Sequence, residues 1–526
     1  MFKRLLCAIL VLALAGSIWY VAVTTDDPEY KGKAVSSDNE EIIDDGSLTL
    51  WYSDEALTDY LSSVALSYQQ DKDIKVNIVL KDGVQFLEDI NAISLADPKD
   101  RQEAAPDLYI TSHDNLLRAY LSGLASEVTD PAQVMTLQYY PKTALDAVTC
   151  YDHFVAYPLY YETNYFLYNK TYMASIAQNK IEAENDQAEG EEATKELEEN
   201  GAPKEEAEEK SAEETNDLGD EAAEDESAQD QADEADPMGE EDATADPVVL
   251  EQLATMIPST IEDIKTFANN YDAPDAVESV FKWDITDIFY NYFFVGNYMD
   301  VGGEHGDNAA IFNIYNKQAV ECLSAYQAMN QFFSIDPKVD NYNNILQDFI
   351  DGKMVFTVAT TDAIKRIHEA KNKGEFDFEY GVSTLPDISN LLKARGLSVT
   401  DAVAINGYSR KVNDANELAT YLVNFKASDL YMKSGKVSCS KKVEYEDSEI
   451  ANVMAEYEKS VPLPKMVEAT NYWVQLEIAF TKVWNGADPD ETLRELSDTI
   501  GAQIEEIKAS LPTQESFNAG AGKFVQ

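Results

Sequence analysis

Apolar and polar residues follow two different periods at the start of the folded region, and this pattern predicts an α/β fold. Residues 48–52 form a short apolar run, typical of a buried strand, and apolar side chains then recur at helical spacing from Leu57 to Tyr68. Residues 74–80 alternate between apolar and polar, which indicates a second strand. Strand, helix and strand at this spacing form a βαβ unit, so we predict a lobe built on a mainly parallel sheet.

Two later stretches combine a buried strand with side chains that can contact a ligand. In residues 106–130 and in residues 154–170 an apolar strand pattern runs into polar and aromatic residues, and a turn or helix follows. Small molecules bind at the carboxyl ends of strands in open α/β sheets. We therefore expect these two stretches to carry a binding site.

The strand and helix pattern stops after Met173 and resumes near Val248. Residues 181–250 contain 29 acidic residues and three lysines, and so carry −26 of the chain's net charge of −57. With no aromatic residue and mostly Ala, Glu, Asp and Gln, residues 181–246 cannot bury enough apolar area to offset their chain entropy. We predict a long disordered acidic insertion over residues 181–247, solvated at the surface, with transient helix or the binding of cations or a basic partner as alternatives.

Composition disfavours several classes of protein. The chain has no basic patch that could neutralise phosphates, so we expect no nucleic-acid partner. Three of its four cysteines are widely spaced, and the fourth, Cys7, lies in the first apolar run, which indicates no disulfide framework. No Cys/His spacing suits zinc and no cofactor-binding motif is present, so we expect no metal and no cofactor.

The N-terminus has the pattern of an export signal. Lys3 and Arg4 precede residues 5–23, which carry no charge and are about long enough to span a bilayer. We predict a signal sequence or membrane anchor over residues 1–25 and an acidic tether over residues 26–46, which places the protein on the extracellular face of the membrane. Cleavage near Ala15, which would release a secreted protein, is the alternative.

Several motifs together resemble one family, the extracellular solute-binding proteins of ABC importers in their maltose/maltodextrin-binding branch. Residues 106–125 match the family's run "PD(I/L)…HD…GLLAE", and residues 156–170 match its crossover "AYP…E…YNK". Residues 462–473 resemble its late segment "P-x-(I/L)-P…W". Each match is short, but their order and spacing are specific, and the resemblance covers about residues 47–175 and 250–510.

This resemblance implies a two-lobe, type II periplasmic-binding-protein-like α/β fold with a hinge and discontinuous lobes. One lobe would comprise residues 47–160 plus 398–438, and the other residues 163–395 plus 440–515. The family captures a solute, here a carbohydrate, outside the cell and presents it to permease subunits in the membrane. The resemblance also implies a monomer without catalytic activity.

The candidate site residues follow from the same alignment. Carboxylates and amides bind sugar hydroxyls, and aromatic faces stack on sugar rings. Asp54 and Glu55 follow the first strand, Asp114 matches an acid of the family's cleft, Glu162 matches an acid at the hinge, and Trp473 matches a stacking tryptophan. The further candidates are Tyr161, Trp283, Asn115 and Glu477.

The chain also departs from the maltodextrin pattern. Glu55 stands where the family has lysine, Asn115 and Glu477 replace basic residues, and Thr111 and Thr361 fall at or near expected tryptophans. The cleft therefore loses positive charge and stacking surface. An acidic cleft suits a neutral sugar bound through acceptors, and it also suits a cationic solute such as an amino sugar or a polyamine.

Two other classes of function deserve comparison with import. Paired carboxylates can cleave glycosides, but the chain has no further catalytic motif, so we do not expect an enzyme. A surface sensor that kept the binding fold is compatible with the sequence, because fold alone does not fix function.

Overall fold

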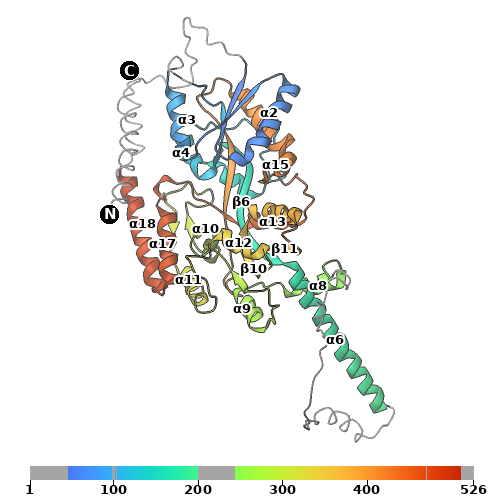
Figure 1. The fold of residues 1–526 in the computed structure, drawn as a ribbon. Coiled ribbons are helices and arrows are strands. Elements are labelled where there is room, and N and C mark those ends of the chain that lie inside the picture. The colour runs from blue at the N-terminus through green and yellow to red at the C-terminus, as the bar shows by residue number, and fades with distance from the viewer. Residues whose placement is uncertain (1–45, 98–100, 102, 200–242, 470, 511–526) are drawn as a thin grey trace, which may run out of the picture. The chain divides into compact units, whose positions relative to one another are not determined.

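The computed structural model describes residues 46–97, 101, 103–199, 243–469 and 471–510. Residues 47–504 form one compact unit, to which the following description applies (Figure 1). The predicted signal sequence or anchor and the acidic tether, except Gly46, lie outside the described residues, as do residues 200–242 of the predicted insertion. Among the described helices, none combines the length and the apolar character needed to cross a bilayer.

The first part of the sheet is the predicted βαβ arrangement. Strands β1 (Leu48–Tyr52), β2 (Val76–Leu80) and β3 (Leu108–Ser112) lie in the order β2-β1-β3, and both pairs are parallel. Helices α2 (Thr58–Lys72) and α3 (Phe86–Leu95) connect them. The predicted parallel α/β lobe is therefore confirmed, with one addition: β12 (Leu397–Ile405) joins the edge of β3 in the antiparallel direction.

One long strand, β6 (Ala156–Asn169), is shared by two parts of the sheet. Its first half pairs with β12 and with β13 (Val437–Ser438). Its second half pairs with β10 (Met354–Thr360) and β11 (Tyr380–Ser383), and β10 pairs in parallel with β7 (Ser279–Lys282). Figure 1 shows β6 running between the two groups of elements.

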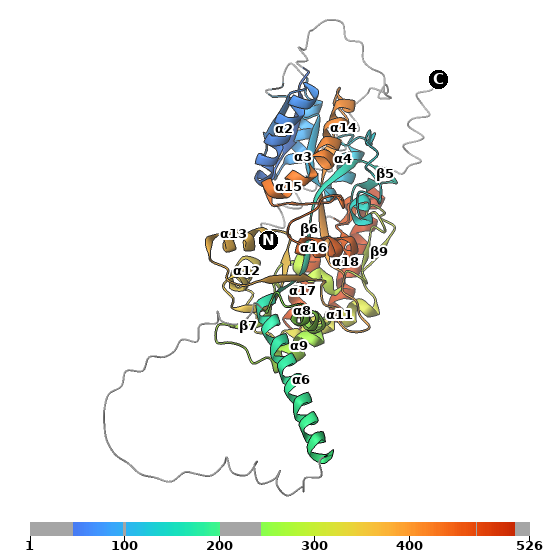
Figure 2. The same cartoon turned by 90° about the vertical axis from the view of Figure 1, so that its right-hand side faces the viewer.

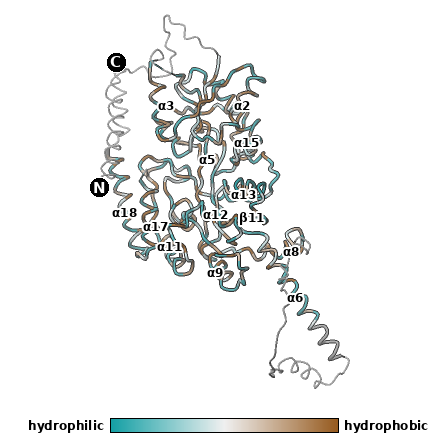
Figure 3. Tube along the Cα trace, in the orientation of Figure 1, coloured by the Kyte–Doolittle hydropathy of each residue, from teal (hydrophilic) through white to brown (hydrophobic). Residues whose placement is uncertain are grey.

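In the second half of β6, from Tyr165 to Tyr168, successive side chains enter two different hydrophobic clusters in alternation. Tyr165 and Leu167 pack in one cluster with residues of β1 and β3 and with α12 (Tyr342–Ile350) and α13 (Asp362–Lys373). Phe166 packs in the other cluster, where its ring stacks on Phe356 at a centroid distance of 5.2 Å. Figure 3 shows hydrophobic residues concentrated along the central strands and a largely hydrophilic α13.

The remaining elements surround this sheet. The helices are α4 (Leu116–Leu121), α5 (Lys142–Ala147), α6 (Lys170–Glu199), α8 (Pro247–Met256), α9 (Ile261–Asn270), α10 (Ile288–Asn291), α11 (Lys317–Met329), α14 (Val412–Thr420), α15 (Ala427–Ser434), α16 (Glu449–Lys459), α17 (Tyr472–Trp484) and α18 (Pro489–Ser510). Single-turn or π-helical segments are Glu55–Leu57, His113–Asn115, Tyr292–Phe294, Tyr421–Phe425 and Val467–Ala469. Short strands are β4 (Thr149–Cys150), β5 (His153–Phe154), β8 (Asp300–Val301), β9 (Phe312–Asn313) and β14 (Val461–Pro462).

Helix α6 corrects the predicted start of the disordered insertion. The helix runs for 30 residues from the end of β6, so residues 181–199 are helical (Figure 2). Ala and Glu are strong helix formers, and Gln178 donates a hydrogen bond to Glu182 one turn later at 3.1 Å. Local propensity therefore extends a helix that is already nucleated by packing against the sheet. On the far side, Asp246 caps the start of α8 by accepting a hydrogen bond from the N–H of Val248 at 2.7 Å.

A buried histidine joins three of the segments that run between the two parts of the sheet. The N–H of Thr400 donates to Nδ1 of His113 at 3.0 Å, so Nε2 carries the proton and donates to the carbonyl of Leu463, also at 3.0 Å. Burial, followed by the charge of Lys465, lowers the pKa of His113 to about 4. Because both ring nitrogens are used, the neutral imidazole holds β12, the turn after β3 and the segment directly after β14 together.

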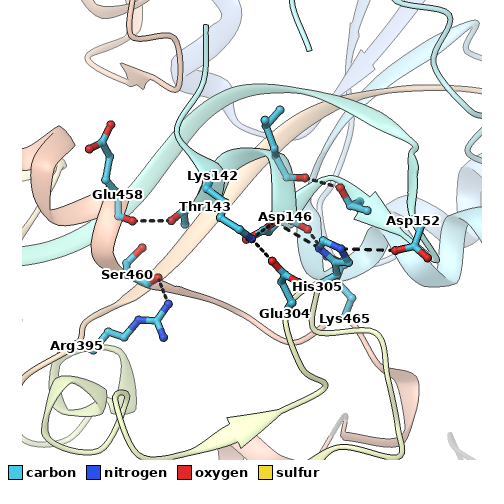
Figure 4. Close-up of polar contacts among 12 residues, drawn as sticks. Lys142, Thr143, Asp146, Asp152, Glu304, His305, Arg395, Glu458, Ser460 and Lys465 are labelled. Carbon is cyan, nitrogen blue, oxygen red and sulfur yellow. Dashed lines mark hydrogen bonds and ion pairs between the residues drawn. The ribbon is translucent and has the colours of Figure 1, made fainter. Parts of the chain in front are cut away.

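A polar junction lies where α5 meets the loop between β8 and β9 (Figure 4). The ammonium of Lys142 lies 2.6 Å from Asp146 and 2.5 Å from Glu304, and the imidazole of His305 lies 3.4 Å from Asp146. Buried Lys465 donates to the carbonyls of Asp146 and Ala147 at the end of α5, at 2.8 and 3.1 Å. This junction fixes α5 against segments that belong to the predicted second lobe.

We predict that His113→Ala destabilises the protein by about 3 kcal/mol at pH 7, because it leaves a buried N–H and a buried C=O unpaired. The folded-state pKa lies below the unfolded value of 6.5, so the unfolded state binds the proton first as pH falls. The wild type has a higher free energy of unfolding than His113→Ala, and this difference should therefore decrease by about 2 kcal/mol as the pH falls from 7 to 5. Urea unfolding at both pH values measures it.

The half-exposed His153 provides the control for this experiment. His153→Ala should change the free energy of unfolding by less than about 1 kcal/mol at either pH. Equal effects of the two substitutions would show that His113 is not the anchor described above.

Candidate ligand-binding site

Strand pairing brings a row of polar side chains to one edge of the sheet. Asp401 of β12 lies directly opposite Ser112 of β3 on one side and opposite Tyr160 of β6 on the other, and Tyr160 lies opposite Ser438 of β13. Residues directly opposite one another in a sheet share a face. We call Ser112, Asp401, Tyr160 and Ser438 the polar row. It lies at the carboxyl end of β3, where ligands bind in α/β sheets.

Close to this row, Lys436 forms ion pairs with two of the predicted site residues. Its Nζ lies 2.9 Å from Oδ2 of Asp54 and 3.0 Å from Oε1 of Glu162. The hydroxyl of Tyr160 donates to the same Oδ2 of Asp54 at 3.2 Å, and the ammonium of Lys436 lies 5.0 Å from the centre of the Tyr160 ring. We call Asp54, Glu162 and Lys436 the charged triad.

The backbone explains why Lys436 reaches this position. Helix α15 ends at Gly435, whose φ of 76° lies in the left-handed region that favours glycine. The chain therefore turns sharply between α15 and β13, and Lys436 emerges at the turn. Asp54 lies two residues after the end of β1 and also accepts a hydrogen bond from the N–H of Ala56 at 3.0 Å, which fixes its carboxylate.

Mutual pairing keeps Lys436 and Asp54 ionised although both are partly buried. Burial alone would lower the pKa of Lys436, but the charges of Glu162 and Asp54 outweigh it and raise that pKa. Burial alone would raise the pKa of Asp54, but its hydrogen bond and charge interaction with Lys436 lower it. At neutral pH the triad therefore presents one ammonium and two carboxylates, which can donate and accept hydrogen bonds side by side.

The structure places the other predicted polar residues at varying distances from this centre. Asp114 is exposed in the turn after β3 and accepts a hydrogen bond from Ser112 of the polar row. Asn115 faces its own helix, where its side-chain oxygen accepts from Arg118 at 2.8 Å. Glu55 is exposed in the turn after β1. Asp114 therefore belongs to the edge that carries the charged triad, whereas Asn115 is occupied locally.

Glu477 lies on α17 and belongs to a separate acidic group with Asp287 and Asp284. It accepts a hydrogen bond from the backbone of Ile288 at the start of α10. Burial, followed by the charges of Asp287 and Asp284, raises its pKa. Its contacts are with the start of α10 and not with the charged triad.

Two of the three predicted aromatic contacts lie in the hydrophobic interior. Trp283 is fully buried, and its Nε1 donates to Asn291 at 2.9 Å. Tyr161 is also fully buried and stacks on Tyr457 at a centroid distance of 3.9 Å. Neither ring has a free face, so we leave both out of the candidate site. Trp473 is half-buried at the start of α17, where it packs edge-on against Tyr292.

A second polar and aromatic group, which the sequence did not indicate, lies at the end of β10. The Tyr342 hydroxyl donates to Asp362 at 2.6 Å and accepts from Thr360 at 3.0 Å, and the Tyr290 ring stacks on the Tyr342 ring at 4.8 Å. Lys365 of α13 donates to the carbonyl of Ser434 at 3.2 Å, which brings α13 beside the turn that carries Lys436. These contacts join residues far apart in the chain, so no local pattern predicts them.

Comparisons with known proteins find a similarity in structure and none in sequence. No protein-family model matches the chain, and no curated protein does. The fold is similar to that of an extracellular solute-binding protein from Staphylococcus aureus in complex with maltose, with a TM-score of 0.62 and 18% identity over 90% of this chain and all of that one.

Two further solved structures agree with this comparison. A cyclo/maltodextrin-binding protein in complex with maltotetraose has a TM-score of 0.61 and 16% identity, over 87% of this chain and 97% of that one. The maltose-binding periplasmic protein of Listeria monocytogenes, in complex with maltose, has a TM-score of 0.60 and 18% identity, over 88% of this chain and 98% of that one. The resemblance predicted from the sequence motifs is confirmed at the level of the fold: the chain has the α/β fold of the maltose- and maltodextrin-binding extracellular solute-binding proteins.

Proposed function

We propose that this protein binds a neutral oligosaccharide outside the cell and delivers it to the permease of an ABC importer. The observation that carries the proposal is the charged triad, in which Lys436 pairs with both Asp54 and Glu162 at the carboxyl edge of the sheet. The fold supports the same class of ligand, because the three similar structures contain maltose or maltotetraose.

The chemistry of the triad suits sugar hydroxyls. A hydroxyl both donates and accepts, so it can donate to a carboxylate and accept from the adjacent ammonium at the same time. A ligand that lacks one of these groups leaves a buried polar partner unsatisfied, which costs about 1–3 kcal/mol and provides discrimination.

The position of Lys436 argues against the alternative of a cationic solute. A polyamine or amino sugar would need free carboxylates, but Asp54 and Glu162 already share an ammonium within about 3 Å. The incoming cation would have to displace Lys436, whose own pairing keeps it charged. The maltodextrin pattern has a lysine at the position of Glu55. In this chain Lys436 supplies the positive charge near Asp54 instead.

The cellular setting is part of the proposal. The N-terminal pattern of the sequence suggests a protein held at the extracellular face of the membrane, and we propose that it is a monomer that meets its permease after binding. A surface sensor would share the binding step and differ in its partner. The binding step is therefore the first one to test.

We expect isothermal titration to show binding of maltose or maltotetraose and no binding of spermidine. Glu162→Gln should weaken sugar binding about tenfold, because an amide is a poorer acceptor and no longer pairs with Lys436 as a charge. The melting temperature without ligand should stay within a few degrees of the wild-type value, because Glu162 is partly exposed. Binding of spermidine alone would replace the sugar hypothesis with the cationic one.

Lys436→Met separates the two ligand classes from the opposite direction. Removing the ammonium leaves Asp54 and Glu162 unpaired, so affinity for the neutral sugar should fall about tenfold and affinity for spermidine should appear. Isothermal titration with both ligands measures this exchange. Lys433→Met, which changes an exposed lysine on α15, is the matched control and should behave like the wild type. A sugar affinity unchanged in Lys436→Met would remove the triad from the site.

A further inference from the structure

Asp401 is an acidic residue within an otherwise mostly apolar strand, and the pairing of that strand fixes its orientation. On the opposite face of β12, Thr400 is buried and its hydroxyl lies 2.6 Å from that of Tyr457. Because successive strand residues alternate in direction, Asp401 faces away from Tyr457 and lies in the polar row between Ser112 and Tyr160. An irregularity in the β12–β6 pairing directly after Asp401 adds one residue to β6, which bends that strand at the row.

The Asp401 carboxyl group has neighbours on every adjacent element but no hydrogen bond to them within the described part of the chain. The groups that interact with it are Glu162 on β6, Lys436 after α15, Asp114 after β3 and Asp54 after β1. Tyr160 lies beside it, but its hydroxyl donates to Asp54. Asp401 is thus a partly buried carboxyl group whose hydrogen-bonding capacity is unused.

Electrostatics determine the form in which this group exists. Asp54, Glu162, Asp114 and Asp401 are four carboxyl groups near a single ammonium, and like charges disfavour the ionisation of the most buried member. Burial, followed by the charge of Glu162, raises the pKa of Asp401 to about 8, although Lys436 acts in the opposite direction. At neutral pH the group is mostly a carboxylic acid, which offers an O–H donor as well as a carbonyl acceptor.

We propose that Asp401 is a further ligand-binding residue of this site and that it contacts a sugar oxygen as a neutral carboxylic acid. The inference rests on the proposed function. It adds a specificity determinant that no motif indicated: the polar row supplies a donor at its centre, between the acceptors Asp54, Glu162 and Asp114. A ligand with a ring or ether oxygen, which can only accept, is matched by this donor.

The test compares wild type, Asp401→Asn and Asp73→Asn in titrations with maltotetraose at pH 6.5, 7.5 and 9.0. Asparagine keeps the shape and the donor of the neutral acid but cannot ionise. The wild-type Kd should rise about tenfold from pH 6.5 to pH 9.0, because the binding form is lost as Asp401 ionises. Asp401→Asn should bind at all three pH values within about threefold of the wild type at pH 6.5.

Asp73→Asn controls for the loss of a surface carboxylate. Asp73 is exposed at the end of α2 with a φ of 58°, a conformation that asparagine also tolerates. This variant should keep the wild-type pH profile. A pH-dependent Kd in Asp401→Asn, a flat profile in the wild type, or lost binding in a folded Asp401→Asn would each overturn the inference while leaving sugar binding intact. Failure of the wild type to bind any maltodextrin would overturn the proposed function and the ligand-binding role together.

A measurement without ligand tests the protonation state separately. The folded pKa of Asp401 lies above its unfolded value of 3.8, so the unfolded state releases the proton first as pH rises. The wild type should therefore lose stability relative to Asp401→Asn between pH 4 and pH 8, and the difference in urea midpoint should level off above pH 8. A constant difference across this range would show that Asp401 is ionised in the folded protein and would overturn the neutral-acid role.

Discussion

The structure depends on one strand that pairs on both sides in two different neighbourhoods. β6 is 14 residues long, roughly 45 Å in extended conformation, and it passes from the β12 pairing to the β10 pairing without ending. A strand shared in this way cannot shift its register in one half without shifting the other, because nearly all of its side chains are buried and those from Tyr165 to Tyr168 alternate between two hydrophobic clusters. Within β6 only Glu162 is not buried, and it lies where the pairing partner changes.

This constraint explains why the candidate binding site lies at that point. Polar side chains from other elements meet on the face of Tyr160 and Glu162, close to the point where the pairing partner changes. Asp54 arrives from the end of β1, and Lys436 arrives from the turn after α15. His113 stabilises the same crossing from within, because its two hydrogen bonds hold β12 and the segment at Leu463 to the turn after β3. The candidate site and the place where these segments meet are therefore held together by the same neighbouring elements.

The sequence predicted those features that are encoded locally. Residues 48–52 and 74–80 carry their own strand period, and residues 154–170 carry an apolar strand that ends in polar groups, so the sheet could be predicted and motif order could indicate the two-lobe fold. Helix α6 continues into the first part of the predicted insertion, because helix propensity extends a helix that tertiary packing has already started. Trp283 and Tyr161 have the right chemistry for stacking, but both lie in the interior. The sequence could not predict this, because a single sequence does not show which aromatic residues the fold buries.

The residues that were missed have one physical cause in common: their role depends on distant partners. Lys436 lies in a stretch that by itself indicates only a helix end, and it acquires a role because β13 pairs with β6 at Tyr160 and Tyr161. Maltodextrin-binding proteins have a lysine next to the acid that follows the first strand, which is Asp54 here. This chain has Glu55 in place of that lysine. What a charged cleft requires is an ammonium within about 3 Å of its carboxylates, and any element that reaches that point can supply it. A substitution at position 55 therefore does not by itself imply an acidic cleft, because the field at the site is set by the fold.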